Sequence, residues 1–543
     1  MSLRGKKVGI TKLTTTALVA AMVTSTMLTG CKLPWQKDDS SEKKQVENTT
    51  GNDAADKEDD SAVTCLTYQV NYETLEPKLD TNPEITAARI KYPVVRLGDY
   101  DGNTFVGIDG YEKLTKAISD YNDKMAADAK ESQQILLEYA NGDAEQEESD
   151  LDSMTDRYCD EITPDISRAD SVAFSMVVND YFDANGAHPS TTYTGVNFDA
   201  STGEDIKLKD IVLNKKGFVS AVKEQLPIQN PDGFGEDAMD YLFVDDLEEY
   251  IAQQLDSDEL TWVLSDDGVE VIFNTYEIAS YANGPAFIDL SFEEYGSLFS
   301  SDYQPIPQEY VKQLYTYTSY EIGKHQLQMR YEDGEPTSLN FYMDEEDVSE
   351  ADPVLTLETQ DTSKDKFYWF HKHDADYLYV DQTLENDEHK LTILNISDGD
   401  VEKIENENPD IAVYDYTPNN PENFLLGKKG HLMGEYQMFR HASLGDSGLP
   451  EFSGEYYMID ASDLRMTVKE DFDAIKLNED TKEEFSDSED SSKVTLKVGT
   501  ELTLYRTDGD SIVDVKDDDG NVYRLNVTKQ YINGTAIEDL LVI

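Results

Sequence analysis

The N-terminal stretch follows a pattern of basic and apolar positions that does not return later in the chain. Four basic residues lie within positions 4–12, and the apolar stretch LTTTALVAAMVTSTMLTGC follows them without an acidic residue. A basic region, a short apolar region and small residues before a cleavage site are typical of a secretory signal peptide. Threonines interrupt this stretch, which is shorter than the about 20 apolar residues of a membrane-spanning helix. We therefore predict that residues 1–31 are an export signal.

From residue 63 to residue 300, the apolar positions follow the two-residue period of strands in some segments and the helical period in others. Strand-like alternation covers residues 63–97 and 171–182, and helical spacing covers residues 109–125, 215–226 and 244–255. Turn-forming residues at 202–203 and 266–268 indicate two hairpins. We predict an α+β domain over residues 63–300, in which helices pack on an antiparallel sheet.

Beyond residue 300 the pattern favours strands almost throughout. Residues 301–477 alternate around turns and predict a β-rich domain, either a sandwich or a few propeller-like blades. The polar and mainly acidic run NEDTKEEFSDSEDSSK contains a predicted linker, residues 478–492. Residues 493–543 have short alternating stretches with tight turns at 508–510 and 519–521, which predict a small SH3-like barrel. The C-terminal region is thus expected to be mainly β.

The charge of the chain restricts its partners. The sequence holds 45 basic and 112 acidic residues, a net charge of −67. Such a surface repels phosphates and anionic lipid head groups and attracts cations and basic proteins. We therefore expect no nucleic-acid binding. Two interpretations stay open: the acidic surface keeps the protein soluble, or it recognises a basic partner.

The end of the apolar stretch carries a second signal. Leu28, Thr29, Gly30 and Cys31 resemble a lipobox, in which the cysteine thiol receives diacylglycerol and becomes the new N-terminus. The resemblance implies lipidation at Cys31 and a location on the extracytoplasmic face of the membrane. The two acyl chains of diacylglycerol are sufficient for stable anchoring. Residues 32–62 are polar and predict a disordered tether. A plain signal peptide that ends at a cysteine is the alternative.

Two further cysteines, Cys65 and Cys159, follow the tether. A pair of cysteines in an exported chain most simply forms a disulfide. In the chain-entropy description, a disulfide that closes so long a loop adds up to about 4 to 5 kcal/mol to the stability of the folded state. We therefore predict a Cys65–Cys159 disulfide, with two buried free thiols as the alternative.

Several motifs of the α+β domain resemble a known family. The loop GAHP, the strand NFD, a TG turn and LKDIV are followed by WVLSDDGVEVIFNTYEIASYANGP and a last strand. In this order, separated by helices, they resemble the extracellular domain of RsiV-type anti-sigma factors and the non-catalytic N-terminal region of PdaC-type peptidoglycan deacetylases. The resemblance covers about residues 64–299, close to half of the mature chain.

RsiV-type domains bind lysozyme, so the resemblance implies a lysozyme-type or cell-wall ligand. This sequence departs from both families elsewhere. It shows no cytoplasmic anti-sigma segment and no second hydrophobic span. No Asp-Asp metal motif with paired histidines, as a deacetylase domain requires, follows Phe299. We therefore expect neither the signalling activity nor the deacetylase activity.

Four residues in these motifs are candidates for ligand binding. His188 lies in the GAHP loop, and Tyr276, Tyr281 and Gly284 lie in YEIASYANGP. The tyrosines offer rigid amphipathic rings of the kind that anchor interfaces, and Gly284 bends the chain. The alternatives are that His188 fixes its own loop by hydrogen bonding and that Tyr276 belongs to the core.

Other candidate chemistry is weak. His371 and His373 are a conceivable metal pair, but a zinc site needs three or four ligands at recognised spacing. The acidic turns at 508–510 and 517–521 lack the spacing of a calcium loop and fit ordinary turn formation. The familiar hydrolase, zinc-protease and nucleotide-binding motifs are absent from the sequence. We therefore expect no metal, no cofactor and no catalytic residues.

Together these patterns predict a membrane-anchored extracytoplasmic lipoprotein that binds a cell-wall glycan or a basic, lysozyme-type protein and is not an enzyme. Two alternatives stay open. One is an enzyme that modifies peptidoglycan or glycans through a carboxylate pair, which the sequence cannot identify because it holds so many carboxylates. The other is a purely structural envelope protein.

Overall fold

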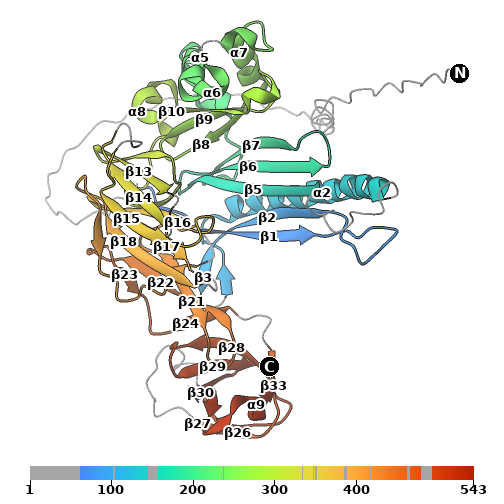
Figure 1. The fold of residues 1–543 in the computed structure, drawn as a ribbon, viewed down its shortest axis with the longest axis vertical. Coiled ribbons are helices and arrows are strands. Elements are labelled where there is room, and N and C mark those ends of the chain that lie inside the picture. Colours follow the sequence, from blue (N-terminus) through green and yellow to red (C-terminus); the bar gives the residue numbers. More distant parts are fainter. Residues whose placement is uncertain are drawn as a thin grey trace, which may run out of the picture. The chain divides into compact units, whose positions relative to one another are not determined.

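Figure 1 shows the computed structural model of the chain. The structure describes residues 62–542, except residues 102–103, 145–156, 236–237, 333, 335, 346–347, 349–350, 385–387, 415–416, 461–464 and 478–491. The predicted signal peptide with Cys31, nearly all of the tether and most of the linker lie outside the described residues. The described residues belong to one compact unit. Among the helices described, none has the length and apolar character to cross a bilayer.

A five-stranded sheet forms the first part of the α+β domain (Figure 1). Its strands, in the order in which they pair, are β1 (Tyr68–Leu75), β2 (Arg89–Leu97), β5 (Tyr158–Ala169), β6 (Ala173–Ala184) and β7 (Ser190–Asp199). Three neighbouring pairs are antiparallel, as predicted, but β2 and β5 are parallel. Parallel neighbours need a long crossover. The hairpin β3 (Asp99–Asp101)–β4 (Thr104–Val106) and helix α2 (Glu112–Ala144) provide it.

Helix α2 covers one face of this sheet and confirms the helix predicted after residue 109. Its buried residues recur at three- and four-residue spacing, as an apolar stripe requires: Leu114, Ile118, Met125, Ala129, Leu136 and Ala140. Asn122 fixes the helix to β2, because its amide accepts from the Val95 N–H at 3.0 Å and donates to the Val95 carbonyl at 2.7 Å.

The second part of the α+β domain is a three-stranded sheet with two helices. β8 (Thr261–Leu264), β9 (Gly268–Phe273) and β10 (Ala286–Ser291) share a core with α5 (Lys215–Gln229) and α7 (Leu247–Ser257). Asn214 and Asp246 cap the helices by accepting from the N–H groups of Gly217 and Glu249. The short helices are α4 (Leu208–Ile211), α6 (Pro231–Phe234), η2 (Met239–Tyr241), η3 (Tyr281–Asn283), α8 (Phe292–Tyr295), η4 (Gly296–Leu298) and η5 (Ser301–Tyr303). Both predicted helices and the 266–268 hairpin are confirmed.

Asn197 on β7 joins the two sheets of this domain. Its side chain donates to the Trp262 carbonyl at 3.1 Å and accepts from the Leu264 N–H at 2.8 Å. The strands approach so closely that a Cβ atom at Gly195 would lie 1.8 Å from the Trp262 carbonyl oxygen. Only glycine therefore allows β7 and β8 to meet here.

The β-rich region begins with two sheets. One pairs in the order β11 (Tyr310–Leu314), β16 (Lys366–Lys372), β17 (Ala375–Thr383), β18 (His389–Asn395) and β19 (Glu402–Ile404). The other pairs in the order β12 (Ser319–Ile322), β13 (His325–Glu332), β14 (Thr337–Met343) and β15 (Leu355–Thr359). Leu327 and Phe341 of the second sheet share an apolar cluster with Leu378 of the first. Two sheets with a common core fit a sandwich.

The remaining strands pair into one fourteen-stranded network. They are β20 (Ala412–Val413), β21 (Phe424–Gly430), β22 (Tyr436–Leu444), β23 (Pro450–Phe452), β24 (Tyr457–Asp460), β25 (Arg465–Val468), β26 (Phe472–Lys476), β27 (Ser492–Leu496), β28 (Glu501–Thr507), β29 (Ile512–Asp517), β30 (Val522–Thr528), β31 (Tyr531–Ile532), β32 (Thr535–Ala536) and β33 (Leu541–Val542), with helix α9 (Ile537–Leu540). Strands before the linker pair with strands after it: β24 and β25 with β28, and β26 with β27 and β30. The described strands therefore do not form the separate closed SH3-like barrel that was predicted.

The predicted Cys65–Cys159 disulfide is wrong in this structure, where both thiols are free. Cys65 forms an isolated bridge with Asp170, just beyond the last residue of β5, whereas Cys159 is near its first residue. At about 3.3 Å per residue, an extended strand of this length separates its ends by more than about 30 Å. A disulfide needs Cα atoms about 4.4 to 6.8 Å apart. The alternative of two buried free thiols is confirmed for Cys159, whereas the free Cys65 is only half-buried.

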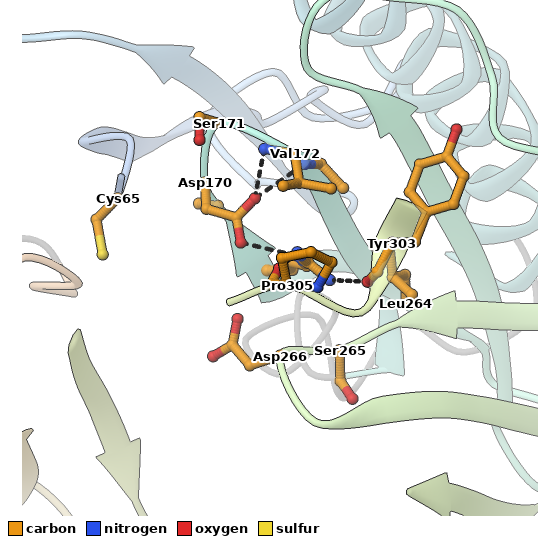
Figure 2. Close-up of polar contacts among 12 residues, drawn as sticks. Cys65, Asp170, Ser171, Val172, Leu264, Ser265, Asp266, Tyr303 and Pro305 are labelled. Atoms are coloured by element: carbon orange, nitrogen blue, oxygen red, sulfur yellow. Dashed lines mark hydrogen bonds and ion pairs between the residues drawn. The ribbon is translucent and has the colours of Figure 1, made fainter. Parts of the chain in front are cut away.

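A buried ion pair connects the α+β domain to the segment that leads into the β-rich region (Figure 2). The Arg168 guanidinium donates to the Asp170 carboxylate at 2.9 Å, and the two side chains are 0% and 1% exposed. Arg168 also donates to the carbonyls of Tyr303 and Pro305, at 2.7 and 2.5 Å. Asp170 accepts from the N–H groups of Val172 and Ala173. The pair therefore orients two segments that are far apart in sequence.

Residues near the start of the domain also contact residues late in the chain. The Asn419 amide donates to the Leu66 carbonyl at 2.6 Å and lies 3.3 Å from the Ala169 carbonyl. His441 Nε2 lies 2.9 Å from the Tyr100 carbonyl oxygen. The first strands are thus held by side chains more than three hundred residues later.

We expect Arg168→Ala to lower the free energy of unfolding by about 3–5 kcal/mol, because it leaves the Asp170 carboxylate buried without its cation. Urea unfolding followed by circular dichroism measures this change. Arg465→Ala is the matched control, since Arg465 pairs with Asp518 at 3.8 Å while both side chains are mostly exposed. Equal losses in the two variants would show that the buried pair has no special role.

Candidate functional site

The structure brings together three of the residues predicted to bind a ligand. His188 lies in the loop between β6 and β7, and Tyr276 and Tyr281 lie between β9 and β10. The His188 and Tyr281 rings stack with centroids 4.0 Å apart. Tyr276 completes the group, with its centroid 6.3 Å from that of His188 and 5.7 Å from that of Tyr281. We call His188, Tyr276 and Tyr281 the aromatic cluster.

Two hydrogen bonds indicate which nitrogen of the His188 ring carries the proton. Its Nδ1 lies 2.9 Å from the Pro189 carbonyl oxygen, which can only accept, so Nδ1 carries the proton. In the neutral ring Nε2 then accepts from the Tyr276 hydroxyl, 3.3 Å away. His188 therefore fixes its own loop, as one alternative proposed, and also holds a tyrosine of the other segment.

The backbone of the second segment is fixed by Asn274. Its side chain accepts from the Tyr193 N–H at 2.7 Å and donates to the Tyr193 carbonyl at 3.0 Å, which attaches the segment to β7. The Asn274 N–H donates to the Glu277 carboxylate at 2.8 Å and closes a turn around Tyr276. Tyr276 has a φ of 70°, which is uncommon for a bulky residue. The turn thus directs the Tyr276 ring outward.

Gly284 ends the short helix η3, which carries Tyr281. Its φ of 74° lies in the left-handed region, as its predicted role in a bend requires. The Asn283 side chain donates to the Gly233 carbonyl at 2.7 Å and fixes this bend against α6. Gly284 therefore shapes the segment.

The aromatic cluster is open to solvent. Tyr276 is 55% and Tyr281 42% exposed, so the alternative that Tyr276 belongs to the core is wrong. Phe243 has a side chain that is 60% exposed, and its backbone N–H donates to the Ile278 carbonyl at 2.8 Å, which places its backbone next to this segment. Sequence reasoning missed Phe243; the only signal was an apolar residue in the run YLFVDD just before α7. The grouped, exposed rings of the aromatic cluster are typical of contact surfaces.

The other candidates from the sequence do not form sites. His371 Nδ1 pairs with Asp376 at 2.7 Å, whereas His373 Nδ1 pairs with Glu309 at 3.0 Å. His371 lies on β16 and His373 in the turn after it, so they do not share a strand face. Within the described part of the chain, no group of three or more histidine, cysteine, aspartate or glutamate side chains is arranged to hold a metal ion.

The two acidic turns are explained by their own hydrogen bonds. Asp508 accepts from the N–H groups of Asp510, Ser511 and Ile512. Asp517 accepts from the N–H groups of Asp519 and Asn521. These bonds use the carboxylates to form the turns.

Two carboxyl pairs have raised pKa values. Burial raises the pKa of Asp180 to about 7, and the neighbouring Asp160 adds to the shift. Burial, followed by the charge of Asp289, raises the pKa of Glu270 to about 8. Each pair lies on neighbouring strands, β5 with β6 and β9 with β10, and its members are hydrogen-bonded to each other. Such partners share a proton.

Comparison with known proteins identifies a DUF3298 domain. Residues 220–293 match the family model described as "Protein of unknown function (DUF3298)". A DUF3298 family member from Bacteroides fragilis is similar in structure, with 17% identity and a TM-score of 0.33, covering 44% of this chain and 94% of that chain. A DUF3298 family protein from Pseudomonas aeruginosa has 12% identity and a TM-score of 0.30, covering 44% and 97%. No curated protein matches the chain.

The Asp160–Asp180 pair predicts a pH dependence of stability. A carboxyl group with a folded-state pKa near 7 instead of 3.8 stabilises the fold below the lower value, and this stability is lost as the pH rises through about 7. We expect Asp180→Asn to remove part of the decrease in melting temperature between pH 5 and pH 8. Differential scanning calorimetry measures the melting temperature of both proteins at the two pH values. The exposed helix residue variant Asp123→Asn is the control, and an equal effect there would contradict this assignment.

Proposed function

We propose that this protein is a lipid-anchored extracytoplasmic binding protein whose aromatic cluster contacts a cell-wall or lysozyme-type ligand. The observation that carries the proposal is the meeting of His188, Tyr276 and Tyr281 from two segments eighty-eight residues apart. A hydrogen bond and a ring stack fix these exposed rings before any ligand arrives. Such preorganisation lowers the entropic cost of binding.

The charge of the chain favours a basic partner. A net charge of −67 attracts a basic protein over a long range and raises the rate of encounter. The tyrosine rings then supply the short-range contact, since a few aromatic residues often carry most of the binding energy of an interface. A muramidase of the lysozyme type combines a basic surface with a presence at the cell wall. A cell-wall glycan is the other source of ligand.

The DUF3298 match limits how far the resemblance extends. The matched residues 220–293 include Tyr276, Tyr281 and Gly284 but not His188. The family description assigns no function, so the proposal of lysozyme recognition is supported by the resemblance of the GAHP and YEIASYANGP motifs and by the geometry of the aromatic cluster.

The carboxylate-dependent enzyme is less well supported. Glycosidases hold the sugar between two carboxyl groups about 5 to 9.5 Å apart. The carboxyl groups of the Asp160–Asp180 and Glu270–Asp289 pairs interact directly with each other, so neither pair fits this spacing. We therefore favour binding over catalysis.

We expect Tyr281→Ala to weaken lysozyme binding about tenfold or more, because it removes the ring that stacks on His188. Isothermal titration calorimetry with a basic muramidase, at low and moderate salt, measures the affinity. Tyr139→Ala is the matched control, since Tyr139 is 54% exposed on α2, outside the aromatic cluster. A parallel titration with soluble peptidoglycan fragments identifies the glycan alternative. Absence of heat with both ligands would reject the proposal.

We expect Cys31→Ala to abolish lipid attachment and release the protein from the membrane fraction. Detergent phase partitioning and mass spectrometry of the N-terminal peptide measure this change. The wild-type peptide should begin at Cys31 and carry diacylglycerol. Cys65→Ala is the control, because Cys65 lies in the folded domain and its thiol has no part in anchoring. An unmodified leader on the wild-type protein would contradict the lipoprotein assignment.

A further inference from the structure

A groove of about 1460 Å³ lies on the face of the five-stranded sheet that is turned away from α2. Cross-strand register places the residues that line its floor on one face: Tyr68, Val70, Tyr72, Thr163, Asp165 and Tyr193. Asp160 and Asp180, which interact with Asp128 of α2, occupy alternate positions on the opposite face. The groove is therefore separate from the surface that α2 covers.

The walls of the groove come from the β8–β9 hairpin and from β11 with the residues after it. The Arg168 bonds to the Tyr303 and Pro305 carbonyls place the segment before β11 against β5. Lys312 on β11 pairs with Asp266 of the hairpin at 3.6 Å. The walls are thus connected to each other and to the floor by polar contacts.

Carboxylates outnumber cations along the groove. The acidic side chains that line it are Asp165, Asp266, Asp267, Glu293 and Glu321, whereas the basic ones are Arg168, Lys312 and Lys366. Glu270 also lines the groove, but its pKa of about 8 keeps it mostly protonated at neutral pH. Two of these basic side chains are already paired with carboxylates: Arg168 with Asp170, and Lys312 with Asp266. Asp165 is exposed within the groove, and desolvation by the surrounding protein raises the pKa of its carboxyl. A cation that enters the groove would stabilise the charged form of this carboxyl group, which desolvation disfavours.

Tyrosines supply the second element of recognition. Tyr68, Tyr315 and Tyr320 surround Asp165 closely enough for its charge to raise the pKa of each hydroxyl, with burial as the main cause. Tyr310 and Trp369 continue the aromatic lining. Aromatic faces bind ammonium and guanidinium groups and stack on the planar guanidinium of arginine. Carboxylates next to aromatic faces therefore favour an organic cation over an inorganic one.

The size of the groove decides between a small ligand and a polymer. Sites for small molecules have volumes of about 300–1,000 Å³, and this groove is larger, at about 1460 Å³. From these contacts we propose that the groove binds an extended peptide segment that carries arginine or lysine side chains. This site shares no residue with the aromatic cluster and goes beyond the function proposed there.

Calorimetric titration of the full-length protein with hexa-arginine amide tests the proposal, and hexa-citrulline amide is the neutral ligand of nearly the same shape. We expect measurable binding of the arginine peptide and none of the citrulline peptide. Asp165→Asn and Tyr315→Ala should each weaken binding at least fivefold. The matched control is Glu224→Gln, which removes the same charge from an exposed position on α5, outside the groove. Circular dichroism verifies that each variant is folded.

Tryptophan fluorescence gives an independent measure of occupancy when the wild type is compared with Trp369→Phe, because Trp369 lines the groove and is one of three tryptophans in the chain. The expected result is an emission change on addition of hexa-arginine that saturates at the calorimetric affinity. Equal weakening by Asp165→Asn and Glu224→Gln would show attraction by bulk charge and overturn the proposal. Binding of hexa-citrulline with the same affinity would also overturn it. Tyr276→Ala should leave hexa-arginine binding unchanged, which separates this site from the aromatic cluster.

Discussion

A buried charge interaction fixes the segment that joins the two main regions. The Arg168 side chain is fully buried. Its guanidinium donates hydrogen bonds to the Asp170 carboxylate and to the backbone carbonyls of Tyr303 and Pro305. A guanidinium presents its donors in a rigid plane, so it fixes the relative positions of these acceptors. The segment before β11, and with it one wall of the groove, is placed by this cation. The value of the pair lies in specifying geometry, since buried ion pairs add little net stability over apolar packing.

Local patterns were sufficient to predict the elements that local forces determine. Apolar stripes, such as the one that begins at Leu114, indicate the helices, and residues 266–268 indicate their hairpin. The parallel pairing of β2 with β5, the network that crosses the linker and the separation of Cys65 from Cys159 depend on which distant strands become neighbours. Alternation of apolar residues carries no information about that choice.

For the candidate site, too, the sequence indicated the local segments but not how they come together. The motifs around His188, Tyr276, Tyr281 and Gly284 indicated the segments, but their meeting depends on Asn274 bonding to Tyr193, eighty-one residues away. The acidic, tyrosine-rich groove was not foreseen, because its floor and walls come from segments that appear as unrelated strands in the sequence. Composition indicated the acidic character of the protein but not where carboxylates and rings lie side by side.

The contact between Asn419 and Leu66 has a consequence for how the chain acquires its structure. A polypeptide made from its N-terminus presents Leu66, in the segment just before β1, long before Asn419 exists, since the two partners are 353 positions apart. Until then the segment lacks the late residues that hold it, and loop-closure entropy opposes the contact. Folding dominated by such distant pairings is slow. The segment before β1 therefore lacks this late contact for most of synthesis, although β1 itself can already pair with β2.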